Sequence, residues 1–339
     1  MALRAAFLAA LALSAAPAGA QDAQPRAVLP IKAVTLSNGA VRYGVPIRIG
    51  ATSLDAALDT GSTGLRVLPG VLKAGDATPG EAPEIYGYAS GSRYEGLAGE
   101  AVLGLGAVAA KAPIHLIASI GCFTHLPRCP ASRTSLPHYG IASDGLPDEG
   151  FKAILGTDMD RARIGNPLSA IGVRRWIVEL PRPGHPDEGR LILNPKPEET
   201  AGYAMLPIVG PYAQIQGGGL HDALPGCLIH AQSKARVCGP VLLDTGTSFL
   251  SVINARNTGP WADGDAVSLE VYGADGVVAA STGFALGSRD AATRLVWRNE
   301  IAAPRPSIFA GAAPYFAWSV LYDARRQQIG LKPRAPAEP

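Results

Sequence analysis

LDTGST at residues 58–63 decides how this chain is interpreted, because LDTGTS at residues 243–248 nearly repeats it in the second half. Each copy follows a hydrophobic stretch and precedes an apolar segment, which predicts a tight turn between two buried strands. In such a turn glycine lets the backbone approach closely, and Thr or Ser hydroxyls can donate hydrogen bonds to a carboxylate. One copy alone would be an ordinary turn. Two copies predict one shared catalytic site that contains Asp59 and Asp244.

Each half also carries an apolar-apolar-glycine triplet after its turn, ILG at residues 154–156 and FAG at residues 309–311. Taken alone these are ordinary core sequence, but their order after the turns indicates a duplicated unit. The polar segment RPGHPDE at residues 182–188 lies between the two turns. We therefore predict an N-terminal lobe over residues 21–182 and a C-terminal lobe over residues 183–339, with a cleft between them for a long substrate.

The composition predicts an all-β protein with few short helices. The chain has 339 residues, more than one usual core, and 40 Gly and 29 Pro interrupt many short Val, Ile and Leu segments. Alternating apolar residues at 41–50 and a turn at 51–55 predict a hairpin that delivers Asp59. Further strands are expected at residues 97–105, 112–118, 176–180, 190–194, 267–272 and 319–322, and short helices at 168–174 and 290–294.

Residues 1–20 have the pattern of a signal peptide: Arg4, an apolar stretch at 5–16 and AGA at 18–20. We expect export to the periplasm or secretion. The alternative is a membrane anchor, but a spanning helix needs about 20 apolar residues, which is more than this stretch has. No later segment is long and apolar enough either, so we expect no membrane anchor. The formal net charge of +2 gives no reason to expect nucleic acid as a partner. We expect a monomer.

The four cysteines form two close pairs in the sequence, Cys122 with Cys129 and Cys227 with Cys238. Export favours two local disulfides, although cross-pairing stays open. Zinc is the competing interpretation, but neither pair has CxxC spacing or a repeated ligand pattern. The acidic run TDMD at residues 157–160 lacks a calcium-loop pattern and is interpreted as a solvated turn. We expect no metal site.

On these motifs the chain resembles the pepsin-like aspartic proteases through most of the sequence after residue 20. YGVPIRIG at 43–50 with the first turn resembles the family's first active-site strand pair, and residues 241–250 resemble the second. Residues 308–311, 319–323 and 328–331 resemble its closing strands. The resemblance implies a bilobal fold with an active-site cleft between the lobes, an extended polypeptide as substrate, and no cofactor.

The resemblance also implies roles around the two acids. Ser62 and Thr247 would hydrogen-bond the acids, Thr60 and Thr245 would brace the two turns against each other, and Gly61 and Gly246 complete the turns.

YGYASGS at residues 86–92 resembles the flap hairpin that closes over substrate in this family. Tyr88 fits best as the flap tyrosine and Tyr86 is the second choice, with Ser90 and Gly91 at the tip. The alternative is a solvent-facing hairpin with half-buried tyrosines. The chain departs from the family at Arg66, where an aromatic residue usually supports the flap, and its segment between turn and flap is shorter.

Two carboxylates within hydrogen-bond distance cannot both ionise cheaply, so they share one proton. The ionised member can take a proton from a water molecule while the other hydrogen-bonds the scissile carbonyl. This chemistry needs no Ser or Cys nucleophile, and the chain has no HExxH motif and no clear G-x-S-x-G elbow. We predict an exported aspartic endopeptidase. The alternative is a pepsin-fold module that binds peptides or proteins without cutting them.

Overall fold

The computed structural model describes residues 25–160, 162–208, 212–215, 218–220, 222–253, 261–298 and 306–335. The predicted signal peptide lies outside the described residues. Within these ranges strands predominate and both α-helices are four residues long, so the all-β prediction is confirmed. No helix in the described ranges is long and apolar enough to cross a membrane.

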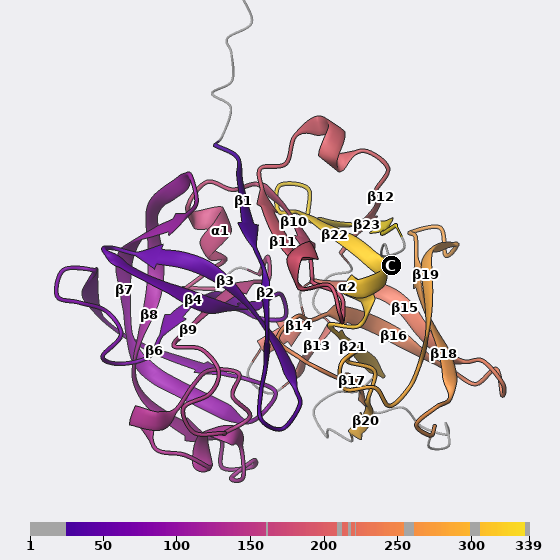
Figure 1. Ribbon diagram of the computed structural model, residues 1–339, viewed down its shortest axis with the longest axis horizontal. Helices are drawn as coiled ribbons and strands as arrows, with labels where there is room; N and C mark the ends of the chain where they lie inside the picture. Colours follow the sequence, from indigo (N-terminus) through magenta and orange to yellow (C-terminus); the bar gives the residue numbers. More distant parts are fainter. Residues whose placement is uncertain are drawn as a thin grey trace, which may run out of the picture.

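The first half of the chain forms an eight-stranded sheet, at the left of Figure 1. In spatial order its strands are β2 (Lys32–Thr35), β3 (Val41–Ile49), β4 (Thr52–Asp59), β9 (Ala153–Thr157), β5 (Thr63–Val67), β8 (Val108–Cys122), β7 (Ser92–Leu105) and β6 (Ala77–Gly87). β3 and β4 are the predicted hairpin, and β4 ends on Asp59. β9 runs parallel to β4, with Leu155 opposite Leu58.

The second half forms a seven-stranded sheet whose central strands are arranged like those of the first sheet. In spatial order its strands are β19 (Val278–Ala285), β18 (Ala266–Tyr272), β15 (Ala223–His230), β16 (Arg236–Leu243), β21 (Ser307–Gly311), β17 (Leu250–Ile253) and β20 (Leu295–Arg298). β16 ends one residue before Asp244 and β21 runs parallel to it, with Phe309 opposite Leu242. Each triplet therefore lies on a strand parallel to the one that delivers an acid. A separate pair, β13 (Tyr212–Ile215) and β14 (Gly218–Leu220), completes this half.

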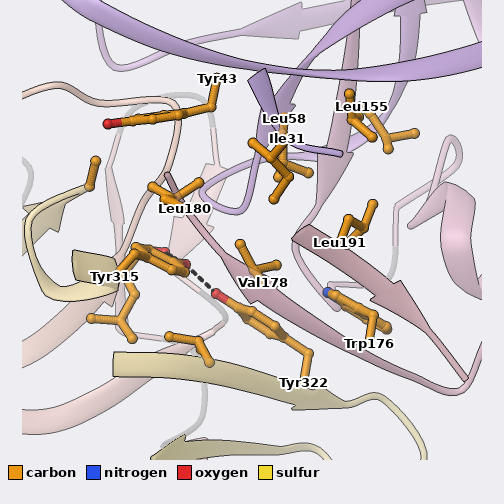
Figure 2. Packing of buried hydrophobic residues seen from close by; sticks show 14 of the residues in the cluster. Ile31, Tyr43, Leu58, Leu155, Trp176, Val178, Leu180, Leu191, Tyr315 and Tyr322 are labelled. Carbon is orange, nitrogen blue, oxygen red and sulfur yellow. Dashed lines mark hydrogen bonds between the residues drawn. The ribbon is translucent and has the colours of Figure 1, made fainter. Parts of the chain in front are cut away.

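A third, six-stranded sheet combines strands from the beginning, the middle and the end of the described chain. Its order is β1 (Ala27–Pro30), β11 (Arg190–Leu193), β10 (Arg175–Glu179), β22 (Trp318–Asp323), β23 (Gln328–Pro333) and β12 (Ala204–Pro207). Figure 2 shows Trp176, Val178 and Tyr322 of this sheet packed in one cluster with Leu58 and Leu155 of the first sheet. The predicted lobe boundary after residue 182 falls on the connection between β10 and β11, and it stays a prediction.

Short helices occupy the remaining connections. The predicted helix at 168–174 is only α1 (Pro167–Ala170), whose N-terminus is capped by the Asn166 side chain. The predicted helix at 290–294 is wrong: Ala292 has φ of 54°, a left-handed conformation that α-helices do not continue through. The other helical segments are α2 (Pro314–Ala317) and the 3₁₀ turns η1 (Pro130–Ser132), η2 (Leu136–His138), η3 (Pro186–Glu188) and η4 (Pro197–Thr200).

Both predicted local disulfides are confirmed. Cys122 bonds Cys129, and Cys227 bonds Cys238 across directly opposed positions of β15 and β16. No free cysteine remains, so none of the four is available as a zinc ligand.

The six-stranded sheet predicts a large difference between two identical substitutions. Leu191 is fully buried, whereas Leu126 is 42% exposed. Leu191→Ala should lower the free energy of unfolding by about 2–5 kcal/mol, because it leaves a cavity in the core that joins the sheets. Leu126→Ala should cost less than about 1 kcal/mol. Denaturant unfolding of both variants measures this, and equal losses would contradict the placement of Leu191.

Candidate active site

The structure brings Asp59 and Asp244 together, each against the opposite turn. A Cβ atom on Gly61 would lie 2.5 Å from Cγ of Asp244, and a Cβ atom on Gly246 would lie 2.6 Å from Oδ1 of Asp59. Any side chain at either position would therefore push a carboxyl out of place. Both aspartates are buried, at 5% and 7% exposed. Two residues 185 positions apart thus form one buried carboxyl pair.

Each carboxyl is held by the same two donors from its own turn. The backbone N–H of Gly61 donates to Oδ1 of Asp59 over 2.9 Å, and Ser62 Oγ donates to Oδ2 over 2.5 Å. In the second turn Gly246 and Thr247 make the corresponding bonds to Asp244, at 2.8 and 2.7 Å. Four fixed donors therefore orient the two acids.

The two threonines join the turns by reciprocal hydrogen bonds. Thr60 N–H donates to Thr245 Oγ1 over 3.1 Å, and Thr245 N–H donates to Thr60 Oγ1 over 3.0 Å. Each hydroxyl then donates to the carbonyl before the opposite acid, Thr60 to Leu243 at 2.8 Å and Thr245 to Leu58 at 2.7 Å. The carboxyl pair therefore rests on a closed ring of bonds between the two halves.

A tyrosine pair extends this ring into the core. The Tyr315 hydroxyl lies 2.9 Å from Thr60 Oγ1 and 2.5 Å from the Tyr322 hydroxyl, the dashed contact in Figure 2. Sequence reasoning did not single out Tyr315. The available signal was its position four residues after Gly311, at the end of the second triplet.

The triplet glycines make room for the turns. A Cβ atom on Gly156 would lie 2.7 Å from the Ser62 carbonyl oxygen, and one on Gly311 would lie 2.4 Å from the Phe249 carbonyl oxygen. Both clashes would involve backbone atoms, which cannot move aside cheaply. Glycine is required because each triplet strand passes directly behind an acid turn.

The electrostatics of the carboxyl pair favour a shared proton. Burial raises the pKa of Asp244 above its ordinary value, and the neighbouring Asp59 raises it further, while the hydrogen bond from Thr247 opposes both. A direct hydrogen bond between the two carboxyls also raises this pKa. In the part of the chain that the structure describes, no Lys, Arg or His forms an ion pair with either acid.

A cleft opens onto the two carboxyls, and its walls are largely apolar. Ala57, Ile141 and Ile154 line it from the first half, and Phe249 and Phe309 from the second. This combination of largely apolar walls with a few polar groups, which include the two acids, is typical of binding clefts.

The predicted flap residues lie at one rim of this cleft. Tyr88 and Ser90 line it, and Gly91, at φ of 90°, closes the hairpin turn by donating to the Tyr88 carbonyl over 2.8 Å. The Tyr88 hydroxyl is buried without a described hydrogen-bond partner. Tyr86 does not line the cleft.

Tyr86 instead packs on Arg66 inside the first sheet. Arg66 is fully buried, and its Cζ lies 3.3 Å from the centroid of the Tyr86 ring, a cation–π stack. Its guanidinium also donates to the Thr63 carbonyl over 2.6 Å. Arg66, the position where the sequence departs from the resembled family, therefore contacts the hairpin directly.

The Cys122–Cys129 loop holds the tip of the hairpin. Phe123 N–H donates to the Gly91 carbonyl over 3.0 Å. A Cβ atom on Gly91 would lie 2.7 Å from Leu126 and 3.1 Å from Cys129, and one on Gly87 would lie 2.2 Å from the Phe123 ring. The loop is thus packed along the hairpin on both sides of Tyr88.

The interpretation of residues 157–160 as a solvated turn is wrong at Asp158. Asp158 is only 4% exposed, because its backbone N–H donates to the Ser62 carbonyl over 2.9 Å and draws it behind the first acid turn. Asp222, just before β15, is 1% exposed and accepts a hydrogen bond from Met159 N–H over 3.0 Å. Sequence reasoning missed Asp222 entirely.

No protein-family model matches this chain, and no curated protein matches it.

The threonine ring predicts a large effect from a nearly isosteric change. Thr60→Val removes the hydroxyl and leaves Thr245 N–H and the Leu243 carbonyl buried without this partner. Unfolding in denaturant should show a loss of about 2–4 kcal/mol. Thr60→Ser keeps the hydroxyl and should stay within about 1 kcal/mol of the wild type. If both variants lost the same stability, the ring would not be the stabilising contact.

The first disulfide predicts a local effect on the hairpin. In Cys122→Ala/Cys129→Ala the amides of Tyr88 and Gly91 should exchange hydrogen at least about tenfold faster, because the loop no longer holds the tip. Cys227→Ala/Cys238→Ala is the matched control, since it removes a disulfide from the other sheet. Equal acceleration of these two amides in both variants would show that only global stability had changed.

Proposed function

We propose that this protein is an exported aspartic endopeptidase with a bilobal, pepsin-like arrangement. The observation that carries the proposal is the matched pair of turns, which hold two buried carboxyls in contact at the base of a cleft. On this proposal the eight-stranded and seven-stranded sheets are the bodies of the two lobes. The two disulfides fit an oxidising compartment.

Each acid has a distinct part in the proposed reaction. Asp244, whose pKa is raised, holds the shared proton and donates a hydrogen bond to the carbonyl oxygen of the scissile peptide. The carboxyl of Asp59 accepts a proton from a water molecule between the two acids, and that water attacks the carbonyl carbon. Asp59 then passes that proton to the amide nitrogen and the C–N bond breaks, which releases the amine and leaves a carboxyl group on the other product. The water is the nucleophile, so no covalent intermediate with the enzyme forms.

The surroundings support the same chemistry. The donors from Gly61, Ser62, Gly246 and Thr247 fix both carboxyls before substrate arrives, which lowers the reorganisation that reaction requires. The proposed substrate is a polypeptide in an extended conformation, because the cleft passes between the hairpin and the two acids. Tyr88 would cover it and help to exclude water.

The proposal predicts that Asp59→Asn and Asp244→Asn each abolish cleavage of an unfolded protein. The loss should reach at least about 10³-fold, because either change removes the shared proton or the base. Activity is measured from acid to neutral pH, with near-ultraviolet circular dichroism to verify the fold. Asp148→Asn, on the surface and 70% exposed in its side chain, is the control and should keep full activity.

Two outcomes would count against the proposal. Full activity in either Asp59→Asn or Asp244→Asn would show that these two acids are not the catalytic pair. Tight binding of a pepstatin-like transition-state mimic, without cleavage by the wild type, would instead favour a module that binds peptides without cutting them.

A further inference from the structure

A second pair of buried aspartates lies behind the first. Asp158 follows β9 of the first half, and Asp222 precedes β15 of the second half. Asp222 accepts a hydrogen bond from the main chain next to Asp158, because Met159 N–H donates to Oδ2 of Asp222 over 3.0 Å. Oδ1 of Asp158 accepts a hydrogen bond from Asp160 N–H over 2.7 Å. The Asp222 side chain therefore connects the two halves of the chain beside Asp158.

The groups that face this pair are acids and phenols. They are Asp59 in the first turn, Asp160 in the same loop, Tyr86 of β6, Tyr315 of α2 and Tyr322 of β22. Among the described residues no cation forms an ion pair with Asp158 or Asp222, and Oδ1 of Asp222 is buried without a hydrogen-bond donor. Two adjacent ionised carboxylates without a counter-charge are costly in such a site.

The pKa shifts agree with this geometry. Burial is the largest cause that raises the pKa of Asp158 to about 7; the charges of Asp160 and Asp59 act in the same direction, while the hydrogen bond from Asp160 N–H opposes them. Burial also raises the pKa of Asp222 well above its ordinary value, with Asp158 as the next cause. A raised acid pKa means that the folded state binds more protons than the unfolded state. The stability that protonated Asp158 contributes is therefore fully present below about pH 4, and this contribution is lost as the pH rises toward 7.

The second pair is linked to the first by one short chain of hydrogen bonds. Asp158 N–H donates to the Ser62 carbonyl over 2.9 Å, and Ser62 Oγ donates to Oδ2 of Asp59 over 2.5 Å. The Asn166 side chain holds the same segment by donating to the Thr157 carbonyl over 2.6 Å. A displacement of Asp158 would therefore move the donor that orients Asp59.

We propose that Asp158 and Asp222 are positioning residues that share one proton, hold the two halves together behind the catalytic pair, and keep Ser62 in place. When this proton is lost at higher pH, the two carboxylates repel each other and Asp59 loses its orientation. The effect on catalysis rests on the proposed function, whereas the effect on stability does not.

Unfolding across the pH range tests the shared proton directly. Between pH 4 and pH 8 the unfolding equilibrium constant of the wild type should rise at least about tenfold more than that of Asp222→Asn, whose amide cannot ionise. Asp158→Asn should behave in the same way, which provides a second variant if one fails to fold. Asp148→Asn, an exposed acid, should follow the wild type. Equal pH dependence in the wild type and both pair variants would overturn the proposal.

The pH profile of peptide cleavage tests the positioning role. In Asp222→Asn the fall of kcat at high pH should occur about one pH unit higher than in the wild type, because no second negative charge develops behind Asp59. The KM should not change, since neither residue lines the cleft. An unmoved limb would refute the positioning role. If no form, the wild type included, cleaves peptides, the proposed function fails, while the unfolding measurements still decide the shared proton.

Discussion

The reciprocal bonding of Thr60 and Thr245 is the constraint on which the site depends. Each hydroxyl accepts from the N–H of the other threonine and donates to the carbonyl before the opposite acid. These groups are buried, so neither turn can satisfy its backbone without the other. The two halves must therefore meet in one register, and the approach of the two carboxyls follows from that register. Contact between the acids is a consequence of backbone satisfaction and needs no attraction between the acids themselves.

Glycine makes this register possible at four positions. Gly61 and Gly246 leave space for the opposite carboxyl, and Gly156 and Gly311 leave space for the backbone of the turn in front of them. In each half a strand delivers the acid and a parallel strand supports the turn from behind. This repeated arrangement explains why the acid turn and the glycine triplet recur together in the sequence. Without the glycine of the triplet, no strand could pass directly behind the turn.

The parts of the site that could be predicted are those with local chemistry. The turns, the hydroxyl donors at Ser62 and Thr247 and the close cysteine pairs depend on residues near one another in sequence, and the repeat supplied their pairing. Asp158 shows the limit, because an acidic run is ordinarily solvated, whereas here hydrogen bonds to Ser62 and Asn166 draw it inward. Asp222 gave no signal at all, since its burial depends on a segment from the other half.

Arg66 is a buried cation that, among the described residues, forms no ion pair with either pair of acids. A guanidinium in direct contact with a carboxylate stabilises its ionised form and lowers its pKa. Arg66 is fully buried and close to this region, yet in the described part of the chain it stacks on Tyr86 and binds backbone carbonyls rather than an acid. Tyr86 contacts Arg66, and burial raises the pKa of this tyrosine. Tyr86 is also close enough to Asp59 and Asp158 for their charges to act on its pKa in the same direction. Tyr86 thus contacts the buried cation and lies near both acids. The π-face of Tyr86 satisfies the cation. On the proposed function and the proposed second proton, the two carboxyl pairs are then neutralised by protons instead of by a salt bridge.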